Sequence, residues 1–254
     1  MLSMSSNNHG APVSEPAVRM VDGVKIYGEG ETAVRALGGV SLRIERGQFT
    51  AIMGPSGSGK STLLHTLAGL DTLEGGEAFI DGVALSTLKD RDLTLLRREK
   101  VGFVFQTFNL IPTLNAEENI LLPISIARED VEQDWFDQIV GTLGLDDRLH
   151  HLPTQLSGGQ QQRVAVARAL ISRPIIVCAD EPTGNLDSRA SDELLGFIRA
   201  AVDNIGQTVV MVTHDPTVAA YADQVVFLED GKVIHEMTDP NAESIFDYLK
   251  SLGE

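Results

Sequence analysis

A glycine-rich loop that ends in a lysine places the strongest constraint on how this chain can fold. Residues 54–61 read GPSGSGKS, between the apolar run FTAIM and the segment STLLHTLAGL, whose leucines recur at helical spacing. An apolar strand that enters a helix through a tight glycine turn is typical of sheets covered by helices. The sequence therefore predicts an α/β fold with this loop at a strand end.

Strand and helix patterns alternate along the second half of the chain. Helical patterns over residues 157–173 and from Ser188 onward are separated by the apolar run IIVCA, and the runs TVVMVTH, QVVFLED and KVIHEM follow. This alternation predicts a mainly parallel core sheet covered on both faces. Residues 18–53 instead indicate an N-terminal antiparallel β subdomain. Residues 107–165 have mostly helical periodicity, which predicts an inserted helical subdomain.

The two ends of the chain differ from its centre in composition. Residues 1–17 are rich in Ser, Asn, Pro and Ala and have little apolar material to bury, which predicts a disordered, mobile tail. Residues 18–240 are expected to form one domain, and residues 241–254 a C-terminal helical tail. The single cysteine, Cys178, lies in the apolar run IIVCA and is expected to be a buried, inert side chain.

The charge of the chain limits the partners that it can have. A net charge of −16 argues against a nucleic-acid partner, because binding to a phosphate backbone requires a cationic surface. The N-terminus lacks a basic start followed by an apolar core, and no apolar run reaches the roughly 18 residues that span a bilayer. We therefore expect a soluble cytoplasmic chain that holds any anionic ligand through local chemistry.

The loop fits the pattern G-x-x-x-x-G-K-[ST], which binds nucleotide phosphates. Its glycines let backbone N–H groups converge on phosphate oxygens, and the following helix presents its positive end. Lys60 is expected to reach the β and γ phosphates of ATP, and Ser61 to supply a hydroxyl to Mg²⁺. The alternative is a flexible glycine turn. The predicted ATP-binding residues here are Gly54, Pro55, Ser56, Gly57, Ser58, Gly59, Lys60, Ser61 and Thr62.

Two adjacent carboxylates follow the apolar run IIVCA. Ligands of open α/β sheets bind at the carboxyl ends of the strands, so Asp180 and Glu181 are expected to face a nucleotide held by the loop. Asp180, beside the strand end, suits Mg²⁺ through a bridging water. Glu181, one residue further, suits orienting and deprotonating an attacking water. The alternative is a solvated acidic turn.

A second anion site is indicated by LSGGQQQR at residues 156–163. Ser157 is placed to cap a helix, and Gly158 and Gly159 expose backbone donors at its positive end. An ordinary capped helix start is the alternative for SGG alone. The full string, downstream of the phosphate-binding loop, predicts that one chain carries two phosphate-binding helix ends.

These motifs together resemble the ATP-binding cassette (ABC) family over residues 18–235. The Walker A loop, the Q-loop residue Gln106, the signature at residues 156–160, the Walker B strand at 175–180 and the D-loop at 185–187 all match. The resemblance implies the P-loop NTPase fold of ABC ATPases. It also implies a head-to-tail dimer that holds two ATP molecules, each between Walker A of one copy and the signature of the other.

The resemblance also implies roles for single residues. Tyr27 matches the aromatic residue that stacks on adenine, and Gln106 matches the residue that contacts Mg²⁺ and water and senses the membrane partner. Glu181 matches the catalytic glutamate, and His214 the switch that contacts the γ-phosphate. Asp187 of the D-loop matches a residue at the dimer interface. The predicted catalytic set is Lys60, Gln106, Glu181 and His214, and the metal set is Ser61, Gln106 and Asp180. The ATP-binding set also includes Tyr27, Asp187 and the signature residues Ser157, Gly158, Gly159 and Gln160.

The remaining histidines match no functional position. They are interpreted as surface or packing residues: His9, His65, His150, His151 and His235.

ABC ATPases drive transporters or serve DNA repair or translation. Repair proteins separate Walker A from the signature by long coiled coils, translation-type members carry two cassettes, and a strongly acidic surface disfavours DNA or ribosomes. This chain has one cassette and about 100 residues between the two motifs. A subunit that drives transport is therefore favoured.

Residues 105–123 and 181–188 resemble the branch that includes lipoprotein-release, macrolide-export and haem-export ATPases and a cell-division relative. The resemblance implies a separate permease with four spanning helices, present in two copies, and a location at the cytoplasmic face of the membrane. The expected activity is ATP-driven export or extraction of a hydrophobic or amphipathic compound; the alternative is gating of an extracytoplasmic wall hydrolase. The permease's coupling helix is expected to contact Phe108, Leu110, Ile111 and Leu114, which could alternatively pack the helical insertion.

Overall fold

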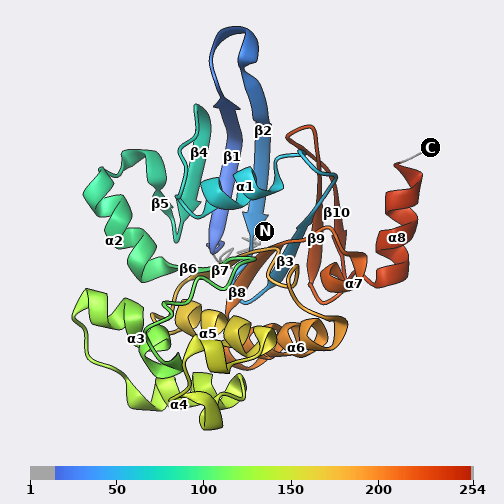
Figure 1. Ribbon diagram of the computed structural model, residues 1–254. Helices are drawn as coiled ribbons and strands as arrows, with labels where there is room; N and C mark the ends of the chain where they lie inside the picture. The colour runs from blue at the N-terminus through green and yellow to red at the C-terminus, as the bar shows by residue number, and fades with distance from the viewer. Residues whose placement is uncertain (1–14, 253–254) are drawn as a thin grey trace, which may run out of the picture.

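The computed structural model describes residues 15–252, which form two sheets with helices around them (Figure 1). The antiparallel sheet has the order β2-β1-β4-β5, and the larger sheet has the order β10-β9-β3-β8-β7-β6. The strands are β1 (Val18–Tyr27), β2 (Val34–Ile44), β3 (Phe49–Met53), β4 (Gly75–Ile80), β5 (Val83–Ala84), β6 (Val101–Val104), β7 (Ile176–Asp180), β8 (Thr208–Val212), β9 (Gln224–Glu229) and β10 (Lys232–Thr238).

Most of the helices connect successive strands along the chain. They are α1 (Lys60–Leu67), α2 (Asp90–Lys100), α3 (Ala116–Ala127), α4 (Gln133–Thr142), α5 (Gly158–Leu170), α6 (Ser188–Ile205), α7 (Pro216–Ala219) and α8 (Ala242–Ser251). Short 3₁₀ turns occur at Gly30–Thr32, Leu85–Thr87, Asp146–Arg148 and Pro153–Gln155. No helix within residues 15–252 is long and apolar enough to cross a membrane.

The larger sheet is parallel except at one edge, as the alternating pattern predicts. Strand β3 pairs in parallel with β8 and β9, and β8 continues in parallel through β7 to β6, whereas β10 pairs antiparallel with β9. In Figure 1 the antiparallel sheet stands at the top, and α5 and α6 lie below the larger sheet. The fold class expected from the sequence is therefore confirmed.

Successive residues of each central strand enter different cores, because side chains alternate across a sheet. Met211 of β8 belongs to the core formed with α5 and α6, whereas Val210 and Val212 belong to the core formed with α1 and the antiparallel sheet. Cys178 lies fully buried in the second core. The larger sheet is thus the central layer, with α1 on one face and α5 on the other.

The beginning of the described chain differs from the mobile tail expected through residue 17. Ala17 is fully buried, and its carbonyl accepts a hydrogen bond of 3.0 Å from the amide of Asp81. Arg46 Nε also donates to the carbonyl of Glu15 at 3.1 Å. Small apolar residues next to β1 extend its packing, which composition alone does not reveal. Residues 1–14 of the expected tail lie outside the described residues.

Helical segments were also expected at residues 107–165 and 241–254. The first range contains α3, α4 and the start of α5, and the second contains α8, whose Ile245 is buried against the core. Helix α3 begins with a capping box, since the Asn115 side chain accepts from the Glu118 amide and the Glu118 side chain accepts from the Asn115 amide.

Candidate functional site

The predicted site residues gather where the parallel strands end. The loop at residues 54–59 follows β3, Asp180 ends β7, His214 follows β8, and Gln106 follows β6. These four strands are close neighbours in one sheet, so their carboxyl ends open onto the same edge. The topology therefore assembles a site from segments up to 160 residues apart in sequence.

The loop before α1 needs glycine at particular positions. Gly54 has φ 155°, and a Cβ there would lie 2.0 Å from the carbonyl oxygen of Leu228. Gly59 has φ 100°, and a Cβ there would lie 2.3 Å from the carbonyl oxygen of Ala36. Both contacts are with backbone atoms that a side chain cannot displace cheaply, so the loop conformation is tied to β9 and β2.

Lys60, the first residue of α1, folds back across this loop. Its ammonium donates to the carbonyl oxygens of Gly54 at 2.9 Å and Pro55 at 2.8 Å. Burial lowers the pKa of Lys60, and the charges of Glu181 and Asp180 act against this shift. The cation therefore lies between the loop and the carboxylates at the end of β7, where it could meet a phosphate group.

Ser61 and Asp180 are brought together, as the sequence predicts for a metal site. Ser61 Oγ donates to Asp180 Oδ1 at 3.2 Å. The pKa of Asp180 is raised, chiefly by burial, although the hydrogen bond from Ser61 opposes the shift. A hydroxyl and a carboxylate at this distance are the oxygen ligands that Mg²⁺ uses in nucleotide sites.

His65, for which the sequence indicates only a surface or packing role, also belongs to this neighbourhood. Its Nε2 lies 3.9 Å from Asp180 Oδ2, and its ring packs against Phe103 with centroids 5.8 Å apart. The available signal was its spacing: His65 is four residues after Ser61, so both side chains lie on one face of α1.

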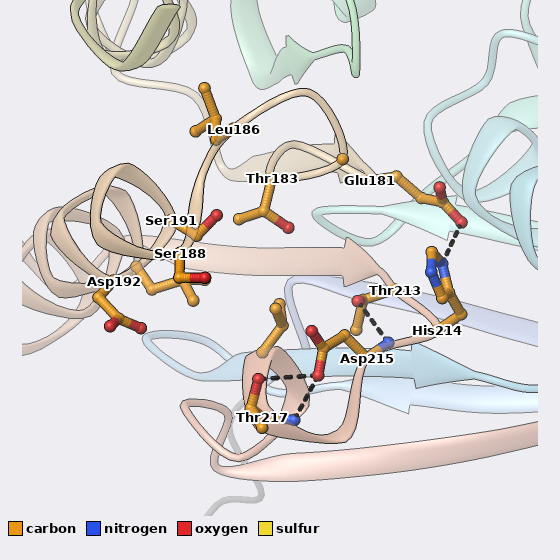
Figure 2. A pocket seen from close by; sticks show the side chains of 13 residues that line it. Glu181, Thr183, Leu186, Ser188, Ser191, Asp192, Thr213, His214, Asp215 and Thr217 are labelled. Carbon is orange, nitrogen blue, oxygen red and sulfur yellow. Dashed lines mark hydrogen bonds and ion pairs between the residues drawn. The ribbon is translucent and has the colours of Figure 1, made fainter.

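Glu181 and His214 point toward one another at one end of a cavity of about 220 Å³ (Figure 2). Glu181 Oε1 lies 3.1 Å from His214 Nδ1. Glu181 has φ 45°, an unusual conformation for a residue with a side chain, and its amide donates to the carbonyl of Val212 at 3.0 Å. The turn after β7 is therefore pinned to β8, and this holds the carboxylate beside the imidazole.

Gln106 lies against the D-loop, which the sequence did not predict. Its carbonyl accepts a hydrogen bond of 3.0 Å from Asn185 Nδ2, and a Cβ on Gly184 would lie 2.7 Å from its Nε2. Asp187, expected at a dimer interface, caps α6: its Oδ1 accepts from the Ala190 amide at 2.8 Å. The capping role has a local signal, because Asp directly before a helical pattern is a preferred N-cap.

Tyr27 ends β1 and is 43% exposed, and its hydroxyl donates to Asp71 Oδ2 at 2.7 Å. The pKa of Tyr27 is raised by burial and by this hydrogen bond, whereas a hydrogen bond with Thr62 acts in the opposite direction. The ring is therefore next to the first turn of α1, which follows the phosphate-binding loop.

The signature segment is built as a capped helix start. Ser157 Oγ accepts from the Gln160 amide at 3.3 Å, and Gln160 Oε1 accepts from the Ser157 amide at 2.9 Å. Gly159 approaches α6, where a Cβ on it would lie 3.1 Å from the Cβ of Ala190. Ser157 itself remains exposed. Ser157 therefore stays accessible, although Gly159 packs closely against α6.

The two predicted phosphate-binding helix ends do not meet. Helix α1 packs into one core through Leu63, Leu64 and Leu67, whereas α5 packs into the other through Val164 and Leu170. Within residues 15–252, no hydrogen bond or ion pair joins residues 54–61 to residues 157–160. The central sheet thus separates them, and one chain cannot close both motifs on the same phosphate.

Comparison with known proteins places this site in one family. The family model described as "ABC transporter" matches residues 37–184. A bacitracin export ATP-binding protein, BceA of Halalkalibacterium halodurans, is 40% identical over 90% of this chain and 92% of its own length. A macrolide export ATP-binding/permease protein, MacB of Bdellovibrio bacteriovorus, is 44% identical over 82% of the chain, which corresponds to only 32% of that longer protein.

A solved structure gives the same answer for the fold. A dimer of the cassette MJ0796, a protein of Methanocaldococcus jannaschii, bound to ADP and inorganic phosphate superposes with a TM-score of 0.78. It is 42% identical in sequence and covers 88% of this chain and 99% of the solved one. The α/β fold, the phosphate-binding loop and these matches agree, and the chain belongs to the family of ABC transporter ATP-binding proteins.

Proposed function

We propose that this ABC ATPase works as a head-to-tail dimer that hydrolyses two ATP molecules to power a separate membrane permease. The observation that carries the proposal is the placement of α1 and α5 against different cores of one sheet. A loop that binds phosphate on one chain then needs Ser157 and the helix end of a second copy to complete the site. The dimeric cassette structures of MJ0796 support the same arrangement.

Mg²⁺ fits the residues at the end of β7. Ser61 Oγ and Asp180 Oδ1 are already in contact, and a cation would favour the ionised form of a carboxylate whose pKa burial raises. Residues 15–252 contain no group of three or more His, Cys, Asp or Glu that could hold a metal. Ser61, Asp180 and Gln106 would therefore hold it together with phosphate oxygens and water. When bound, Mg²⁺ neutralises phosphate charge.

The chain's own residues divide the hydrolytic work. Lys60 carries positive charge to the β and γ phosphates, and Glu181 takes the proton of the attacking water. His214, held by Glu181 at 3.1 Å, orients toward the γ-phosphate through its other ring nitrogen. Ser157 of the second copy faces the same phosphate from the opposite side.

We propose that the permease binds a groove beside residues 108–114, the segment that the sequence predicts as its contact. Leu110 packs against the core, and Arg168 donates a hydrogen bond to the backbone carbonyl of Phe108. Ile111 is 38% exposed. A mainly apolar groove lies beside them, and its lining includes Val101, Gly102, Phe103, Leu122, Pro123 and Ile126.

The charges in this groove indicate what docks there. Its charged lining residues are Arg98 and Arg168, and no carboxylate lines it. Arg98 Nε is buried without a hydrogen-bond partner, while its Nη2 lies 3.4 Å from Glu99 Oε1, and burial lowers the pKa of Arg168. A short permease helix with an apolar face and a carboxylate fits both features. With such a permease the subunit would lie at the cytoplasmic face of the membrane and export a hydrophobic or amphipathic compound, as the bacitracin and macrolide relatives suggest by their names.

A mixing experiment tests the composite site directly. Lys60→Ala removes the phosphate lysine and Ser157→Arg blocks the signature, so each variant alone should hydrolyse no ATP. A heterodimer has one site with both parts intact, and random mixing should restore up to about one quarter of wild-type activity. Mixing each variant with more of itself is the control. If the mixture stays inactive while wild type turns over, the head-to-tail arrangement is wrong.

A further inference from the structure

Lys25 is a buried cation beside the proposed adenine platform. It is only 6% exposed, and its ammonium donates to Asp71 Oδ1 at 2.7 Å, to the Thr72 carbonyl at 2.7 Å and to Glu74 Oε1 at 3.1 Å. Burial alone would lower the pKa of Lys25, but these carboxylates outweigh it and the pKa is raised. The ammonium is therefore charged and fully occupied by protein partners, so it is not free to bind a phosphate.

The same carboxylate holds Tyr27. Asp71 uses Oδ1 for Lys25 and Oδ2 for the Tyr27 hydroxyl, which donates at 2.7 Å. Burial raises the pKa of Asp71, but the hydrogen bonds from Lys25 and Tyr27 outweigh it and the pKa is lowered. Asp71 thus stays ionised near neutral pH and accepts from both neighbours.

Strand geometry puts the cation under the ring. Lys25 and Tyr27 are two residues apart on β1, so their side chains lie on one face of the strand. Lys25 Nζ lies 5.1 Å from the centroid of the Tyr27 ring, within the range of a cation–π contact. Tyr27 is 43% exposed, which leaves room for a planar group to stack on its ring. The ring is therefore fixed by the backbone at one end and by its hydroxyl at the other.

We call the two hydrogen bonds that Asp71 accepts, from Lys25 and from Tyr27, the latch. The latch also links the ring to the phosphate-binding helix. Asp71 follows α1, and its amide donates to the carbonyl of His65 on that helix at 3.3 Å. Glu74 closes a second link, because its Oε2 accepts from the Ile26 amide at 2.8 Å. The end of β1 and the helix that begins with Lys60 are thus held at a fixed spacing.

We propose that Lys25 and Asp71 are positioning residues that hold Tyr27 at the correct place for the adenine base, so that base and triphosphate are bound at once. This rests on the proposed function, in which Tyr27 stacks on adenine. The latch acts on binding of the base and not on the chemistry at the γ-phosphate. Its loss raises the KM for ATP and leaves kcat and the binding of a ligand without a base unchanged.

The test compares ATP with inorganic tripolyphosphate, which uses the phosphate-binding loop but has no base to stack. Tyr27→Phe keeps the ring and the Lys25–Asp71 pair and removes only the hydroxyl hydrogen bond, so it should fold normally. Asp71→Ala removes the hydrogen bonds from both Lys25 and Tyr27 to Asp71 and leaves Lys25 bound to Thr72 and Glu74. Both should raise the KM for ATP by about five- to tenfold, because base stacking contributes strongly to affinity, while the inhibition constant of tripolyphosphate and kcat stay within about twofold. Tyr248→Phe, a phenol on α8, is the matched control.

The outcomes separate the latch from the proposed function. Tyr27→Leu removes the stacking ring itself and should raise the KM for ATP at least as much as Asp71→Ala does. If Tyr27→Leu raises the KM for ATP but Tyr27→Phe and Asp71→Ala do not, the positioning role of the latch is wrong, whereas stacking of Tyr27 on adenine is retained. If these two substitutions weakened the binding of ATP and of tripolyphosphate equally, the phosphate-binding loop would be damaged, and this would also overturn the positioning role of the latch. A wild-type chain that neither binds nor hydrolyses ATP would remove the proposed function first.

Discussion

His214 Nδ1 and Glu181 Oε1 lie 3.1 Å apart, so the imidazole and the carboxylate that follow neighbouring strands hold each other. An ionised carboxylate only accepts hydrogen bonds, so with Glu181 ionised the donor in this contact is Nδ1, and under the proposed function Nε2 would face the nucleotide. The contact therefore ties the orientation of the His214 ring to the direction of the Glu181 side chain. Under the proposed function, chemistry at the γ-phosphate depends on this pair and not on either residue alone.

Replacing the carboxylate of this pair should separate ATP binding from turnover. Glu181→Gln keeps the size of the side chain but removes the base, so the rate of phosphate release should fall about 10²-fold or more. ATP binding should persist, and the variant should accumulate as a closed dimer. Light scattering after size-exclusion chromatography, with and without ATP, measures the dimer. Glu193→Gln, an exposed acid on α6, is the control; near-normal turnover of Glu181→Gln would remove Glu181 from the role of base.

Two glycines of the loop offer a matched comparison of steric demand. Gly54 and Gly57 both have positive φ, but a Cβ on Gly54 would lie 2.0 Å from a backbone oxygen, whereas nothing lies within 4 Å of a Cβ on Gly57. Gly57→Ala should therefore cost only the backbone strain, about 1–2 kcal/mol. Gly54→Ala should force the loop away from Leu228 and abolish ATP binding. Thermal unfolding and ATP titration measure both; equal effects of the two substitutions would contradict this explanation.

Local patterns explain why the secondary structure and the strand-end residues could be predicted. The helix from Ser188 to Ile205 and the strand before Asp180 have strong periodicity and sharp ends, because caps, glycines and prolines act over a few residues. The rule that ligands bind at strand ends then brought Lys60, Ser61 and Asp180 into one site.

Contacts between distant segments could not be read from the same patterns. Asp71 is 44 residues from Tyr27, and nothing near either residue indicates that they are paired. The burial of Ala17 likewise depends on a strand that lies about 60 residues later. Such details are decided by how the antiparallel sheet packs on α1, which composition and spacing do not determine.

The proposed permease groove should respond to charge at its rim. Ile126 is 68% exposed on α3 and lines the groove, so Ile126→Asp should change neither stability nor ATPase activity of the isolated subunit by more than about twofold. Co-purification with the permease should fall by about tenfold, because an apolar contact is replaced by a charge. Phe246→Asp on α8, also exposed and outside the groove, is the control. Equal losses for both variants would argue against the groove.

Asp81 should contribute to stability in a way that depends on pH. It pairs with Lys100 at the end of α2 and with Arg46, and the pKa of Asp81 is lowered by the hydrogen bond from Lys100, which outweighs burial, and then by Arg46. A carboxyl whose folded pKa is below its unfolded value near 3.9 stabilises the fold above that value, and this contribution disappears as the pH falls through the folded pKa.

Asp81→Asn removes the charge at a site where the chain has φ 51°, a conformation that Asn tolerates as well as Asp. The free energy of unfolding should fall by about 1 kcal/mol or less at pH 7, since the pair is partly exposed. The difference between wild type and variant should shrink as the pH is lowered from about 5 to about 2. Urea unfolding at several pH values measures it, with Asp247→Asn on α8 as the control. A difference that stays constant down to pH 2 would mean that the charge of Asp81 does not stabilise the junction between α2, β4 and the end of β2.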